Sequence, residues 1–280
     1  MSTLVFLTVI GAALLHASWN ALIKGGNDKR LSMGALVLGH LPIAIIAIAF
    51  VPVPEAASWP YIIAGIALHM GYQLFLLQSY KIGDLTQVYP IARGSAPLIV
   101  TVVSVVFLGI ALTTMQLAAV ALIGLGILGL VRRADGAQNR KAAILALGTG
   151  CFIASYPLVD GLGARLAGTS LGYYSYLSIG NGLCMFVYLY ATGPSVFKGM
   201  LTKGRAAFVI GGSASFLAYA MVTWAFTQAP IALVTALREV SIVFALLIGV
   251  VFLKERLNVT RIFSTILTLV GVILLRISKT

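Results

Sequence analysis

The sequence predicts an all-α integral membrane protein of ten transmembrane helices, arranged as two inverted five-helix repeats around a central cavity. Three observations predict this class: the composition, the length of the apolar segments and an internal repeat. Of the 280 residues, 60% are hydrophobic and 9% are charged, and the mean hydropathy is +1.03. A soluble domain carries about 25% charged residues, so the bilayer is the expected solvent of this chain.

Apolar segments of about 20 residues follow one another along the chain, and each is long enough to cross a hydrocarbon core of roughly 30 Å. They lack the alternating pattern of barrel strands. Because lipid offers the backbone no hydrogen-bond partner, helices are the expected structure. The ten expected spans are 3–23, 31–51, 59–80, 85–108, 113–131, 141–162, 171–192, 205–226, 231–253 and 258–277.

An internal repeat relates the two halves of the chain. The segment Leu85–Thr113 aligns without gaps with Pro230–Asn258, which places Arg93 on Arg238. An arginine matched to an arginine inside a membrane span is an uncommon coincidence. An odd number of spans in each half makes the halves enter the membrane in opposite directions, as in many secondary transporters. The expected repeats cover residues 1–133 and 141–280.

The net charge of +12 is spread over short connectors, which favours a role in membrane orientation over nucleic-acid binding. The connectors after the odd-numbered spans hold most of the basic residues: Lys24, Lys29, Arg30, Lys81, Arg132, Arg133, Arg140, Lys141, Lys198, Lys203, Arg205, Lys254, Arg256 and Arg261. The opposite side holds Arg165, Arg276 and Lys279. The positive-inside rule then places both termini outside the cytoplasm.

The helix pattern and two short motifs together resemble the drug/metabolite transporter superfamily, in its ten-helix EamA-like branch. The motifs are VYPIARG at Val88–Gly94 and VFLKERL at Val251–Leu257. The resemblance implies two EamA-like repeats around a central cavity, alternating access, and a multi-pass location in the inner cell membrane. It also implies cytoplasmic termini, which disagrees with the charge count. The junction Gly109–Leu112 lacks the Glu-Arg pair of its counterpart.

Arg93 and Arg238 are the first candidate substrate-binding residues. Arg93 lies about eight residues into its span, or roughly 12 Å deep, so it is expected to face a cavity or a partner. Two guanidinium groups that converge on a cavity suit a phosphate, phosphonate or carboxylate. An anionic or zwitterionic substrate, such as an amino acid, is therefore expected. The open alternative is that both arginines bind backbone carbonyls or Glu239 and hold the helices together.

Glu239 is the only acid expected deep within a span, because Asp84, Asp160 and Glu255 fall near expected span ends. It is expected to act either as a titrating coupling site or as a fixed counter-ion. Neighbouring residues point about 100° apart around a helix. Arg93 of the other half is therefore a better partner for Glu239 than the adjacent Arg238.

Polar side chains that share one helix face are expected to line the cavity, because they must turn away from lipid. Interhelical hydrogen bonding is the alternative for each of them. The third span places His69, Tyr72 and Gln73 on one face, and the first span does the same with His16, Trp19 and Asn20. Tyrosines of other spans complete the expected lining: Tyr89, Tyr156 and Tyr219.

These observations predict a secondary transporter of a small polar metabolite, coupled to a proton or to an exchanged solute. An exporter of broad specificity, a channel and an intramembrane enzyme are the alternatives, and a homodimer is left open. The sequence has no His-Glu-x-x-His motif and no metal-ligand spacing. We therefore expect no enzyme activity, no metal, no cofactor and no nucleic-acid partner.

Overall fold

The computed structural model describes residues 2–24, 28–82, 113–128, 137–241 and 259–277, together with positions 92, 95, 96, 99, 243, 244, 247 and 248. The regular secondary structure of these residues is helical. The α-helices are α1 (Thr3–Lys24), α2 (Lys29–Leu38), α3 (His40–Ile48), α4 (Trp59–Ile82), α6 (Thr114–Leu128), α7 (Ala137–Leu166), α8 (Ser170–Thr192), α9 (Ser195–Met200), α10 (Gly212–Gln228), α11 (Ile231–Arg238) and α13 (Val259–Ile277). A 3-10 helix covers Ala56–Ser58, and a π-helix covers Ala207–Gly211.

The structure contains long apolar helices of the kind that the sequence predicts. Four segments are long and apolar enough to cross a bilayer: Lys29–Ile48, Ala56–Ser79, Ile144–Leu166 and Ala207–Gln228. Large apolar side chains also point outward from several helices, as a lipid-facing surface requires: Leu4, Leu7, Ile63, Leu183, Val187 and Leu217. The count of ten helices and the inverted repeat stay predictions.

The expected span 31–51 is a pair of consecutive helices, α2 and α3, that meet at Gly39. Pro42 explains the break, because a proline has no N–H and its ring collides with the carbonyl four residues earlier. That carbonyl belongs to Leu38, the last residue of α2. The expected span 205–226 begins with the π-helix, and the expected span 85–108 lies outside the described residues except for four isolated positions.

A tight turn between α7 and α8 positions two helices of the candidate site. Gly168 has a φ of 68°, a left-handed conformation in which glycine ends a helix without strain. Thr169 then caps α8, since its hydroxyl accepts a hydrogen bond of 3.1 Å from the backbone N–H of Gly172. The backbone N–H of Glu55 donates to the carbonyl of Ala167 at 3.1 Å and holds the turn.

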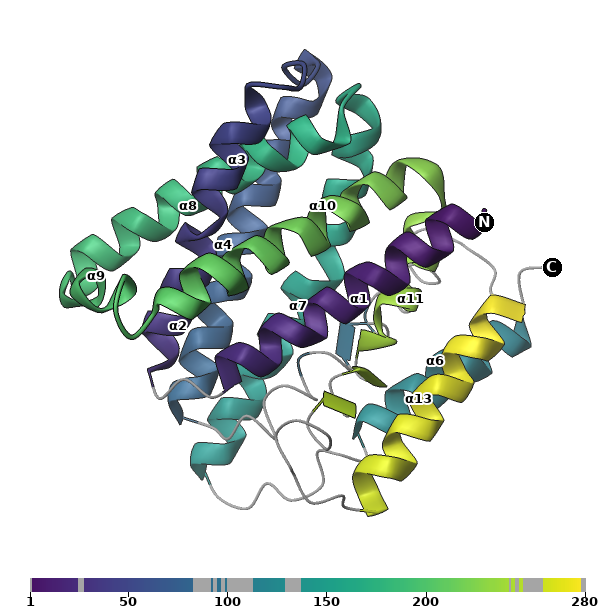
Figure 1. Ribbon diagram of the computed structural model, residues 1–280. Coiled ribbons are helices and arrows are strands. Elements are labelled where there is room, and N and C mark those ends of the chain that lie inside the picture. Colours follow the sequence, from purple (N-terminus) through teal and green to yellow (C-terminus); the bar gives the residue numbers. More distant parts are fainter. Residues whose placement is uncertain are drawn as a thin grey trace. The chain divides into compact units, whose positions relative to one another are not determined.

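The chain packs as two compact units, each of which takes residues from both halves of the sequence. The first unit comprises residues 1–70 and 157–249. Within it α1 lies along α10 (Figure 1), and α8 packs against α2, α3 and α10. Arg165 ties α7 to the end of α10, because Nε donates to the carbonyl of Phe226 at 2.8 Å and Nη2 to that of Ala229 at 2.9 Å. These contacts fasten the helices that carry the site.

In the first unit, the backbone between α2 and α3 packs directly against the backbone at the start of α10. A Cβ added to Gly212 would lie 2.7 Å from the Cα of Gly39, and one added to Gly39 would overlap the carbonyl oxygen of Phe208. The break between α2 and α3 therefore packs directly on the junction between the π-helix and α10. Only glycine at both positions permits this distance.

The second unit comprises residues 71–156 and 250–280. In it α6 and α13 lie side by side (Figure 1). Gly271 permits the close approach of these helices, because a Cβ there would lie 2.5 Å from Cγ1 of Ile123 and 2.8 Å from the carbonyl oxygen of Ala119. This is the small-residue packing that is common between membrane helices.

Candidate functional site

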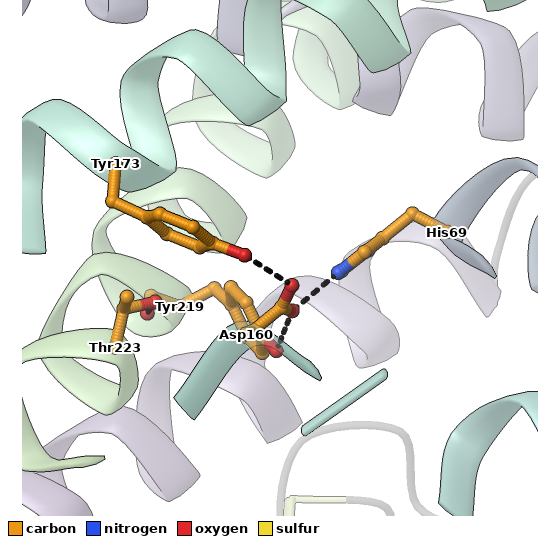
Figure 2. Close-up of polar contacts among 5 residues, drawn as sticks. All are labelled: His69, Asp160, Tyr173, Tyr219 and Thr223. Carbon is orange, nitrogen blue, oxygen red and sulfur yellow. Dashed lines mark hydrogen bonds and ion pairs between the residues drawn. The ribbon is translucent and has the colours of Figure 1, made fainter. Parts of the chain in front are cut away.

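A completely buried carboxylate, Asp160 of α7, is the centre of the first unit's polar contacts. Its Oδ2 accepts a hydrogen bond of 2.5 Å from the hydroxyl of Tyr219 and lies 2.8 Å from Nε2 of His69. Its Oδ1 accepts a hydrogen bond of 3.3 Å from the hydroxyl of Tyr173. Figure 2 shows all three side chains pointing at the one carboxylate. Four helices, α4, α7, α8 and α10, therefore meet at Asp160.

Glycines of α4 and α7 allow the neighbouring helices to come this close. A Cβ on Gly65, one turn before His69 in α4, would lie 2.7 Å from Oδ1 of Asp160. A Cβ on Gly163 would lie 2.6 Å from Cβ of Tyr61, and one on Gly161 would lie 2.5 Å from Cδ1 of Ile231. The hydrogen-bond distances around Asp160 thus depend on residues that have no side chain.

Aromatic rings surround the polar contacts. The ring of Tyr219 lies 5.3 Å from that of His69 and 5.0 Å from that of Tyr174, measured between centroids. Phe216 lies 5.0 Å from Tyr174 and 6.0 Å from His40. Such packing keeps the local dielectric low, so charges and hydrogen bonds among these groups interact more strongly than they do in water.

Two further charged residues are buried at the end of α11. Arg238 is 7% exposed and Glu239 is 4% exposed. The guanidinium carbon of Arg238 lies 5.1 Å from the centroid of the Tyr219 ring, which is a cation–π contact. Tyr219 therefore contacts Arg238 with its ring and Asp160 with its hydroxyl.

The expected cavity residues fall in both units. In the first unit, His69, Tyr219 and Arg238 are brought together, while Trp19 packs edge-on against His16 with ring centroids 4.9 Å apart. Among the described residues, Nε1 of buried Trp19 has no hydrogen-bond partner.

In the second unit, Tyr72 lies 6.1 Å from Tyr156 between ring centroids, and Gln73 is buried. Arg93 and Tyr89 lie outside the described residues, as does the side chain of Asn20. The meeting of Arg93 with Arg238 or Glu239 therefore stays a prediction.

Asp160 was expected near a span end, with Glu239 as the only acid deep within a span; in the structure Asp160 is completely buried and Glu239 is buried as well. Helix α7 continues to Leu166 and tolerates Pro157 in its interior. Gly161 and Gly163 permit close packing of neighbouring helices. An acid in a long segment without other acids was the signal available. Tyr173 was also missed, because nothing in the sequence separates it from the other tyrosines of α8.

The contacts suit the binding of protons or polar solutes more than the binding of metals. Within the described part of the chain, no group of three or more His, Cys, Asp and Glu side chains is placed to hold a metal ion. The hydroxyls of Tyr173 and Tyr219 donate to the oxygens of Asp160, which a metal ion would need as ligands.

Comparison with known proteins identifies relatives by sequence and by fold. The model of the EamA-like transporter family matches residues 140–277. Curated proteins gave no match. A crystal structure of a protein that is 17% identical in sequence superposes with a TM-score of 0.76, over 98% of this chain and 96% of that chain. At this identity the likeness concerns the fold alone.

Proposed function

Because this chain belongs to the EamA-like transporter family, we propose that it is a secondary transporter that carries a small polar metabolite by alternating access. The family assignment and the apolar helices make it a multi-pass membrane protein of the drug/metabolite transporter type. The class of the solute, the inverted repeat around a central cavity and a location in the inner cell membrane are further parts of the proposal.

The observation that carries the solute class is the burial of Arg238. An arginine near the centre of a bilayer costs on the order of 3 kcal/mol even on the most lenient scale. A buried arginine in a membrane helix is therefore expected either to bind a ligand or to hold helices together. The guanidinium carbon of Arg238 lies over the Tyr219 ring, and a guanidinium carries five N–H donors in a planar fork that suits an anionic group. We propose that Arg238 binds a carboxylate, phosphate or phosphonate group of the solute.

A zwitterionic solute also fits the charges of the first unit. Glu239 follows Arg238 and is buried as well, so an amino group and an acidic group would each find an opposite charge. Arg93, Tyr89 and Asn20 are proposed as further solute contacts on the basis of the sequence repeat and the polar helix faces. Trp19 is proposed as another solute contact, because its buried Nε1 donor lacks a hydrogen-bond partner among the described residues.

A thermal-shift screen tests the solute class. Purified protein is heated with metabolites grouped as anions, zwitterions and cations, and a ligand at 100 times its Kd should stabilise the folded state by about 2.7 kcal/mol. We expect anions or zwitterions to raise the melting temperature of the wild type. Arg238→Gln should remove this rise, and Arg238→Lys should reduce it because lysine lacks the planar fork.

Arg205→Gln is the matched control, since Arg205 is exposed just before the π-helix and should respond like the wild type. Stabilisation by cations alone would contradict the proposed solute class. An undiminished response of Arg238→Gln would exclude Arg238 from the solute site.

A further inference from the structure

We propose that the pair His69–Asp160 binds and releases the proton to which transport is coupled. The proposal rests on the proposed carrier function. With Asp160 ionised and His69 neutral, the pair has a net charge of −1. Uptake of one proton from water gives either an imidazolium beside a carboxylate or a neutral imidazole beside a carboxylic acid. The net charge is then zero in both cases, and release of the same proton on the other side of the membrane restores the first state.

The contacts of Asp160 favour a proton over other ligands. Both carboxylate oxygens already accept hydrogen bonds or face His69, and the residue is completely buried. A solute or a metal ion would have to displace Tyr173 and Tyr219, whereas a proton needs no added volume. A net charge on a completely buried pair is expensive to keep. Neutralisation by a proton removes that expense.

His69 is the member of the pair that a proton reaches first. The side chain of His69 is 11% exposed, while that of Asp160 is 0% exposed. Imidazole is the side chain that gains and loses a proton near neutral pH. Its Nε2 faces Oδ2 of Asp160 at 2.8 Å, so a proton on the ring is shared directly with the carboxylate.

Tyr219 links this pair to the proposed solute arginine. Its hydroxyl donates to Oδ2 of Asp160 at 2.5 Å, and its ring lies against the guanidinium of Arg238. A hydrogen bond to a charged acceptor is roughly twice as strong as a neutral one. In the state in which the proton lies on the carboxyl group, the hydrogen bond from Tyr219 is therefore weaker, and the surface that Arg238 packs on changes. Tyr219 thus contacts both the proposed proton site and the proposed solute site.

The titratable and charged neighbours come from each helix that packs on this region. They are His69 and Tyr61 of α4, Tyr173 and Tyr174 of α8, Tyr219 of α10, Arg238 of α11 with Glu239 after it, and His40 of α3. Glu239 is the other buried acid among these groups. A measurement must therefore separate Asp160 from Glu239, and Asp160→Asn and Glu239→Gln form a matched pair.

Infrared difference spectroscopy tests the proton site on the purified protein without a solute. Spectra are recorded from about pH 4 to pH 9, a range that covers carboxyl and imidazole groups. We expect one titration step that joins imidazole and carboxyl bands in the wild type and in Glu239→Gln, and that is absent from Asp160→Asn. In His69→Gln the carboxyl band should change without the imidazole band, and its midpoint should move by about one pH unit or more, a tenfold change in proton affinity.

The proposal is overturned if the wild type shows no such step. A joint imidazole and carboxyl step that persists in Asp160→Asn would overturn it as well. An unmoved midpoint of the carboxyl band in His69→Gln would do the same. Both variants remove a single titrating group and keep the approximate volume of the side chain, so an altered spectrum in a folded sample reports on the proton.

Coupling is tested in proteoliposomes with the metabolite that gives the largest thermal shift. An imposed pH gradient should drive accumulation by the wild type and by the control Arg205→Gln. Asp160→Asn should exchange labelled for unlabelled metabolite yet fail to accumulate it, and Tyr219→Phe should accumulate it less. Accumulation by Asp160→Asn at the wild-type level, or a wild type that ignores the gradient, overturns the coupling. Absence of exchange by the wild type would instead contradict the carrier function, and the infrared titration then decides the proton site alone.

Discussion

Replacement of Asp160 by alanine is expected to lower the free energy of unfolding by about 2–5 kcal/mol and to abolish transport. The change removes the acceptor shared by His69, Tyr173 and Tyr219. Interhelical hydrogen bonds in membrane proteins contribute about 0.6 kcal/mol on average and up to about 1.7 kcal/mol each, so three of them give this range. The measurement is unfolding in mixed detergent micelles, followed by circular dichroism.

Asp28→Ala provides the comparison for this result. Asp28 caps α2, because its Oδ1 accepts hydrogen bonds from the backbone N–H groups of Arg30 at 2.9 Å and Leu31 at 3.1 Å. Loss of an N-cap costs about 1 kcal/mol. We expect Asp160→Ala to exceed this loss and Tyr219→Phe, which removes one hydrogen bond, to approach it. An Asp160→Ala protein as stable as Asp28→Ala would show that the four-helix junction contributes little.

Substitution of Gly39 by alanine is expected to destabilise the first unit by about 1–3 kcal/mol, the usual cost of overpacking. The backbone at Gly39 has φ −66° and ψ −15°, which alanine adopts readily. In an open position the same change would stabilise the protein by about 0.4–1 kcal/mol through the unfolded state. Here the new Cβ overlaps the carbonyl oxygen of Phe208, and a backbone atom cannot rotate away.

Gly11→Ala is the control for Gly39→Ala. Its added Cβ would lie 3.2 Å from Cε of Met221, the end of a flexible side chain that can move. The thermal midpoint of Gly11→Ala should equal or exceed that of the wild type, whereas that of Gly39→Ala should fall. Equal midpoints for the two variants would mean that the contact between the α2–α3 break and α10 is loose.

Hydropathy alone located most of the described helices. Expected spans such as 59–80 and 171–192 agree with α4 and α8 within two residues at each end, because the length of an apolar run is set by the bilayer. The break at Gly39 was not foreseen, although Pro42 was visible. A proline can end a helix or only bend it, and packing against another helix decides between these outcomes.

The site was predicted in part. His69, Tyr219 and Arg238 were expected to face the protein interior on the grounds that polar side chains avoid lipid, and the structure places them in contact. Asp160 was expected near a span end because the expected span 141–162 stops two residues after it, whereas α7 continues to Leu166. The contacts that bury it come from α4, α8 and α10. Such long-range contacts are not visible in one sequence.

Counterflow in proteoliposomes tests the carrier function most directly. Vesicles are loaded with the unlabelled metabolite that stabilises the protein most, and labelled metabolite is added outside. Under these conditions an alternating-access carrier exchanges unlabelled metabolite inside for labelled metabolite outside, so we expect saturable, transient accumulation of label that Arg238→Gln lacks. Label that only equilibrates, at a rate that does not saturate, would show a pore and would contradict the account.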